Sequence, residues 1–195
     1  MGRLCLLATL LVGLGSCRPK WVAYPQDQNP IEVCAPFKSP QMIKIPHFER
    51  SYMIVLDCFT VDRERISIAM SFFLEEWRKN FPGSVDIAET ALNDIVIEFD
   101  DTEKRTSGYT NDGEYIRNAV VSGLTYTRGM AWVKTSPGDR ICQTSFIHEL
   151  VHLVLWYKSD IHGDPDHEGD AYDGWSYRHT GIIDSVNRRL CELGV

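Results

Sequence analysis

One stretch of the chain is apolar on every side of a helix apart from three ionisable residues. Residues 146–157 read Phe-Ile-His-Glu-Leu-Val-His-Leu-Val-Leu-Trp-Tyr, with His148, Glu149 and His152 in an H-E-x-x-H pattern. Residues four apart share one face of a helix, so the two imidazoles can reach one metal ion. A helix that is apolar all round is normally buried, and burying these three groups is costly unless a partner compensates them. A divalent metal with an activated water would compensate all three. The alternative is a chance match in a core helix.

The bulk composition fits one soluble domain and argues against nucleic acid as a partner. The 195 residues carry 20 basic and 27 acidic side chains, a formal charge of −7. A chain of this length can bury a sizeable core. Lys and Arg are scattered without a basic stripe, so we expect no nucleic-acid binding.

The N-terminus has the pattern of an export signal. A short basic start at Arg3 precedes a small apolar segment from Leu4 to Gly15, too short to span a bilayer stably. It ends in Leu14-Gly15-Ser16-Cys17, which resembles the lipobox of bacterial lipoproteins. The resemblance implies cleavage before Cys17, acylation of its thiol (palmitate) and a membrane anchor. Arg18 follows, which implies the outer membrane in a Gram-negative source. The alternative is an ordinary secretory signal.

The remaining cysteines are suited to disulfides. Cys34, Cys58, Cys142 and Cys191 remain after Cys5 and Cys17 are set aside. An exported chain can pair four cysteines in three ways, and we favour Cys34–Cys58 and Cys142–Cys191. Free buried thiols are the alternative. No C-x-x-C occurs, so we do not expect thiolate zinc ligands.

Three segments follow from these patterns: a signal peptide over 1–16, a Pro-rich extended tether over 17–46 and a folded domain over 47–195. A turn-rich loop is expected at 107–114 and a long polar loop at 159–179. Periodicity predicts the following elements: strands over 53–59, 95–99, 120–126 and 130–134, and helices over about 63–80 with Asp62 as cap, from near Ile141 to about Ser159, and from about Thr180 to Leu193.

This order gives an α+β domain with a small mixed sheet backed by helices. Over roughly residues 50–170 the chain resembles the catalytic core of zincin metallopeptidases, in which such a sheet packs on the H-E-x-x-H helix. It departs from the metzincin pattern, because Leu155 and Lys158 stand where that group has Gly and His. No Met follows Met130, so its Met-turn is missing too.

Catalytic zinc usually takes three protein ligands, and the third is expected after the motif helix. If the helix continues to Ser159, His162 has only three residues, about 10 Å, in which to return. His167 has eight residues, roughly 26 Å of reach, after the reversal at Gly163-Asp164-Pro165. Similar Gly-Asp-x-x-His loops follow H-E-x-x-H in bacterial envelope lipoproteins. We therefore predict His167, with the alternatives Asp164, Glu168, His162 and Asp184 left open.

With zinc bound, Glu149 is the expected general base that takes a proton from the metal-bound water. A second group should stabilise the oxyanion, and we favour Tyr177 or His179, with Tyr172 and Arg178 of the same segment left open. An extended substrate is expected to pair with the sheet's edge strand, which we predict at Gly129 to Val133.

The sequence thus predicts a zinc-dependent peptidase in the bacterial envelope, a monomer with a peptide or protein substrate and with the membrane as partner through Cys17. Two alternatives remain: a non-catalytic zinc-binding envelope lipoprotein, and a metal-independent interaction module in which the motif is fortuitous. The presence of Glu149 argues against the non-catalytic lipoprotein, because a structural zinc site needs no general base.

Overall fold

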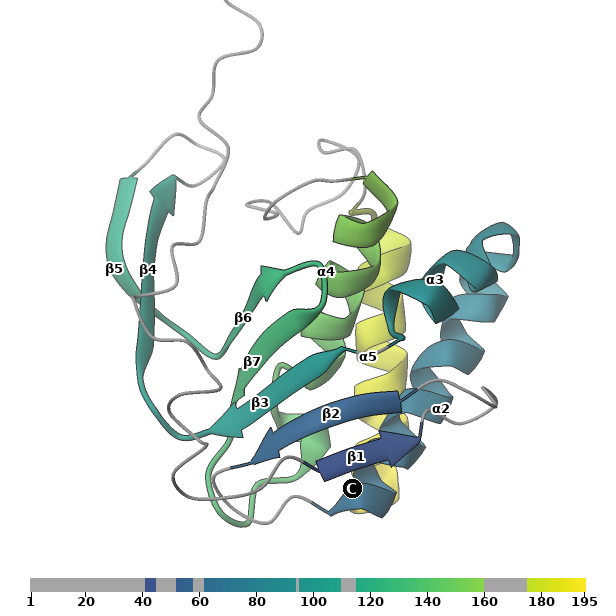
Figure 1. The fold of residues 1–195 in the computed structure, drawn as a ribbon, viewed down its shortest axis with the longest axis horizontal. Coiled ribbons are helices and arrows are strands. Elements are labelled where there is room, and N and C mark those ends of the chain that lie inside the picture. The colour runs from purple at the N-terminus through teal and green to yellow at the C-terminus, as the bar shows by residue number, and fades with distance from the viewer. Residues whose placement is uncertain (1–40, 45–51, 58–61, 94, 110–114, 160–174) are drawn as a thin grey trace, which may run out of the picture.

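A five-stranded mixed sheet forms one layer of the molecule, and helices cover one of its faces (Figure 1). The computed structural model describes residues 41–44, 52–57, 62–93, 95–109, 115–159 and 175–195. Within these ranges the chain is α+β, as the sequence predicts.

The sheet runs in the order β1 (Gln41–Lys44), β2 (Tyr52–Asp57), β3 (Val96–Asp100), β7 (Met130–Lys134) and β6 (Gly123–Thr127). The three central strands β2, β3 and β7 are parallel. The two outer strands β1 and β6 are antiparallel to their neighbours. Among the described strands, β6 is therefore at the edge of the sheet, and its direction is opposite to that of the parallel centre.

A second, two-stranded antiparallel ribbon is formed by β4 (Lys104–Tyr109) and β5 (Tyr115–Val121). It stands beyond β6 and away from the helices (Figure 1). The expected loop at 107–114 is wrong in its first part, because β4 continues to Tyr109. This strand lacks the alternation of apolar and polar residues by which strands are recognised in a sequence. Its first five residues are Lys104, Arg105, Thr106, Ser107 and Gly108.

Two further strand predictions need correction. The single strand expected at 120–126 is divided at Ser122, whose carbonyl oxygen accepts from Lys134 N at 2.9 Å. β1 lies inside the segment expected as a tether, so the sheet begins before residue 47. By contrast, β7 has the predicted bounds, and β2 and β3 lie within two residues of theirs.

The helices of the described residues are α2 (Arg63–Asn80), α3 (Val85–Ala91), α4 (Phe146–Ser159) and α5 (Tyr177–Glu192). A 3-10 turn, η1 (Pro82–Ser84), leads into α3. α2 has the predicted bounds, and its cap is Asp62, whose carboxylate accepts from Glu64 N at 2.9 Å. α2 and α5 lie side by side behind the sheet (Figure 1).

Two helices begin elsewhere than expected. Ile141–Gln143 form a separate 3-10 turn, η2, and α4 starts at Phe146, whose backbone N–H donates to the Thr144 hydroxyl. α5 starts at Tyr177 rather than after Thr180, because Ser176 occupies the cap position. α4 ends at Ser159, as predicted.

The core lies between the sheet and the helices. Ile97, Phe99, Ala131 and Val133 project from β3 and β7 into it, and the rings of Phe99 and Phe146 are 5.5 Å apart. Most of α4 is buried, as its apolar sequence predicts.

The Cys142–Cys191 disulfide is confirmed and ties η2 to the end of α5. Cys34 and Cys58 lie outside the described residues, as do the expected signal peptide and Cys17. No described helix has the length and apolarity needed to cross a membrane.

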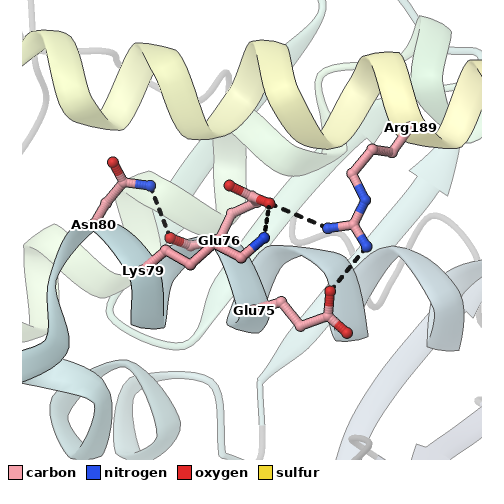
Figure 2. A network of polar contacts seen from close by, with 5 residues as sticks. All are labelled: Glu75, Glu76, Lys79, Asn80 and Arg189. Atoms are coloured by element: carbon pink, nitrogen blue, oxygen red, sulfur yellow. Dashed lines mark hydrogen bonds and ion pairs between the residues drawn. The ribbon is translucent and has the colours of Figure 1, made fainter.

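An ionic network joins α5 to α2 (Figure 2). The Arg189 guanidinium contacts Glu75 Oε2 at 2.8 Å and Glu76 Oε1 at 3.2 Å, and it lies 3.7 Å from the centre of the Phe72 ring. Lys79 Nζ is 2.7 Å from the same Glu76 oxygen. One planar guanidinium therefore holds two carboxylates and stacks on a ring, which fixes how the two helices pack.

Candidate metal site and general base

The two motif histidines converge on one point. His148 Nε2 and His152 Nε2 are 3.0 Å apart, and their rings meet edge to face with centroids 4.7 Å apart. They project from successive turns of α4, and both are partly exposed. Two nitrogens bound to one tetrahedral zinc at about 2 Å are separated by about 3.3 Å, so the pair fits two corners of such a site.

The described residues supply no third ligand. Within them, no further His, Cys, Asp or Glu joins the pair to complete a metal-binding group. His167, Asp164, Glu168 and His162 all lie in 160–174, outside the described residues, so that choice stays a prediction. Asp184 is exposed on α5, two residues after buried Ile182 and two before buried Val186, which places it on the opposite face of that helix.

Glu149 is buried, and β6 holds its carboxylate. Its side chain is 3% exposed, and Oε2 accepts a hydrogen bond from Thr125 Oγ1 at 2.8 Å. Burial raises the pKa of Glu149 to about 8, and the Thr125 hydrogen bond opposes the rise. A divalent cation beside the carboxylate would lower this pKa.

Trp175 packs against both motif histidines. Its ring lies 5.2 Å from that of His148 and 5.0 Å from that of His152, and it is 3% exposed. Trp175 Nε1 donates to the Thr180 hydroxyl at 3.1 Å, which satisfies the buried indole. The indole therefore restricts the rotamers of both imidazoles.

Of the two favoured oxyanion candidates, His179 is buried and Tyr177 is exposed. The His179 ring stacks on Phe81 at 4.4 Å, and its Nδ1 accepts from the Ser176 backbone N–H at 2.9 Å. Burial lowers its pKa to about 4, with Lys158 adding to the effect, so the ring is neutral at pH 7. Tyr177 is 69% exposed. His179 reaches the histidine pair indirectly, through Trp175, whose ring is 6.0 Å from its own. An oxyanion role for either residue stays a prediction.

The predicted substrate edge is wrong in position. β7 lies between β3 and β6, so Gly129 to Val133 cannot offer a free edge, whereas β6 has a neighbour on one side in the described sheet. β6 is also the strand that contacts α4 at Glu149.

A second buried ionisable group lies on the other face of the sheet. Glu98 alternates with core residues of β3 and is fully buried, and its Oε2 is 3.1 Å from Lys104 Nζ. Burial raises the pKa of Glu98 to about 7 against the lowering effect of Lys104. Beside it, Asp100 Oδ1 accepts from Trp132 Nε1 at 2.7 Å. This cluster is separate from the residues of the H-E-x-x-H helix.

No match to this chain was found among protein-family models, curated proteins or solved structures. The site therefore rests on its own geometry. Thr125 and Trp175 are the residues that motif reading missed. No local pattern marks Thr125, whereas Trp175 is a large aromatic residue after a polar segment and carried a weak signal.

Proposed function

We propose that this chain is a zinc-dependent peptide-bond hydrolase, with His148 and His152 as metal ligands and Glu149 as the general base. One observation carries the proposal. α4 carries two imidazoles that converge within 3.0 Å of each other, and the same helix carries Glu149, whose carboxylate accepts a hydrogen bond from Thr125 of β6. A structural zinc site has no need of a base in that position.

Each residue has a role in hydrolysis. Zinc, when bound, makes its water more acidic and polarises the scissile carbonyl. Glu149 takes the water's proton and delivers it to the leaving amine. His167 is proposed as the third ligand. Trp175 keeps the two described imidazoles in the orientation that binding requires.

The substrate is proposed to be an extended peptide that pairs with β6. This strand lies next to Glu149 and is antiparallel to the parallel centre of the sheet. Backbone hydrogen bonds to a sheet edge bind a peptide with little dependence on its sequence. The arrangement resembles that expected of a zincin core, with the edge role on β6.

A non-catalytic zinc-binding lipoprotein is the second candidate. The burial of Glu149 favours it, because a 3% exposed carboxylate has limited access to bulk water. The two candidates make different predictions for cleavage and the same prediction for metal content.

We also propose that the chain is anchored in a bacterial envelope, in the outer membrane of a Gram-negative source, by a lipidated Cys17. Cys17→Ser should move the protein from the membrane pellet to the soluble fraction and block processing. Unchanged pelleting of that variant would place the anchor elsewhere.

Metal analysis and a cleavage assay together test the hydrolase. We expect about one zinc per chain and cleavage of casein or a peptide library that stops with a chelator and returns with added zinc. The His148→Ala, His152→Ala double variant should lose both. Full zinc content in that variant would refute the metal site, and stoichiometric zinc without cleavage would favour the non-catalytic candidate.

A further inference from the structure

The two carboxylate oxygens of Glu149 have different surroundings, and residues of β6 contribute to the surroundings of each oxygen. Oε2 accepts the hydrogen bond of the Thr125 hydroxyl. A buried carboxylate needs such a donor, since a carboxylate with no partner is costly to bury. Thr125 lies 24 residues before Glu149, so this hydrogen bond depends on the packing of β6 against α4 and not on the local geometry of the helix.

Gly123 leaves space for Oε1, the other carboxylate oxygen of Glu149. A Cβ added at this residue would overlap Oε1 of Glu149 and Oγ of Ser145, and it would come within 2.8 Å of Glu149 Cδ. The carboxylate therefore lies directly on the backbone of β6. Ser145 holds the residue just before this strand, because its hydroxyl donates to the Ser122 carbonyl oxygen at 2.6 Å.

Gly123 and Thr125 are two residues apart on one strand, so they face the same side of the sheet. One provides space for the carboxylate and the other provides a hydrogen bond. Together they restrict the rotation of the Glu149 side chain, which otherwise has three rotatable bonds.

We propose that Thr125 is the positioning residue of Glu149, and that β6 thereby sets the base in register with a substrate paired to the same strand. The inference rests on the proposed hydrolase function. Because one strand holds both the base and the peptide, a shift of the strand would move both together. The distance between the carboxylate and the scissile bond is then preserved.

The decisive comparison is between Thr125→Val and Thr125→Ser in the full chain. Val has nearly the same shape but no hydroxyl, whereas Ser keeps the hydroxyl and loses a methyl group. Thr125→Val should keep one zinc per chain and lose about 10- to 100-fold in kcat, with KM changed less than about twofold. Thr125→Ser should stay within about threefold of the parent in kcat.

Thr135→Val is the matched control. Thr135 is a buried threonine at the end of the sheet, and its hydroxyl contacts the Val133 carbonyl oxygen. Thr135→Val replaces a hydroxyl by a methyl group, as Thr125→Val does, but at a residue that does not hydrogen-bond to Glu149. The kcat of Thr135→Val should therefore equal that of the parent. Unchanged kcat in Thr125→Val, or an equal loss in Thr125→Ser, overturns the proposal.

A measurement without turnover separates this proposal from the hydrolase. In the metal-free chain, Thr125→Val should lower the denaturant midpoint, and this shift should shrink in a Glu149→Ala background because the partner is gone. If the parent shows no cleavage but the two shifts are coupled, the hydrolase fails and the Thr125–Glu149 link stands. If the shifts are additive, the link fails whatever the activity.

Discussion

The indole ring of Trp175 packs against the imidazole of His148, with ring centroids 5.2 Å apart. The same indole also contacts His152, so one buried side chain holds both motif histidines. Residues that orient metal ligands typically change metal affinity 10- to 100-fold when they are lost.

Replacing Trp175 by Ala should therefore weaken zinc binding by about tenfold or more, measured by competition with a chromogenic chelator. Trp175→Phe keeps a ring against the imidazoles and should retain most of the affinity. Thr180→Val is the control for the hydrogen bond to the indole, and its effect should be smaller than that of Trp175→Ala. Equal affinity in Trp175→Ala and the parent would show that the indole does not hold the ligands.

Gly123→Ala should impair both stability and cleavage. The added methyl group would overlap the Glu149 carboxylate, so either the strand or the side chain must move. Overpacking of this kind typically costs about 1–3 kcal/mol in the free energy of unfolding. Gly129→Ala is the matched control, since a Cβ there meets nothing within 4 Å. Urea denaturation and kcat should both separate the two variants, and indistinguishable variants would contradict the contact at Gly123.

His179 should make stability depend on pH below neutrality. Its pKa is lowered from 6.5 to about 4 in the folded chain, so the unfolded chain binds the proton first. The stabilisation is complete above about pH 6.5 and is lost as pH falls to about 4. The difference amounts to on the order of 3 kcal/mol.

His179→Gln tests this dependence, because Gln can still accept from the Ser176 N–H but does not titrate. Glu98 acts in the opposite direction: its raised pKa favours the folded chain below about pH 4.5, and this is lost as pH rises through about 7. The informative quantity is therefore the parent-minus-variant difference in unfolding free energy at pH 7 and pH 4. An equal difference at both pH values would show that His179 is not the responsible group.

Arg189→Ala should reduce the free energy of unfolding by roughly 1–3 kcal/mol, because a partly buried guanidinium loses two carboxylates and a ring. Arg188→Ala, one residue away and exposed, is the control and should fall within about 0.5 kcal/mol of the parent. Thermal unfolding distinguishes them. Similar melting temperatures would mean that the network in Figure 2 contributes little.

The sequence predicts the elements that have strong local signals. Asp62 followed by apolar residues at helical spacing predicts α2 to the residue, and the alternation in Met130–Lys134 predicts β7. α5 begins three residues before its predicted start at Thr180, because Ser176 occupies the cap position and its backbone N–H donates to His179 Nδ1. A capping box usually has Glu or Gln at the third helical position, whereas here that position is held by His179.

Sheet order and contacts between distant elements are not readable in the same way. β7 inserts beside β3, which leaves β6 at the edge, and neither strand's own residues encode that choice. The motif predicts that His148 and His152 converge, because helical spacing is local. The hydrogen bond from Thr125 depends on how β6 crosses α4, and no pattern within either segment predicts it.

The most direct test of the hydrolase is the Glu149→Gln variant, assayed for zinc content and cleavage in the same preparation. The amide has the shape of the carboxylate and can still accept from Thr125, but it cannot take a proton from water at neutral pH. We expect one zinc per chain, an unchanged fold and a loss of about 10²- to 10⁴-fold in kcat. A zinc-loaded Glu149→Gln variant that cleaves as fast as the parent would contradict the central claim.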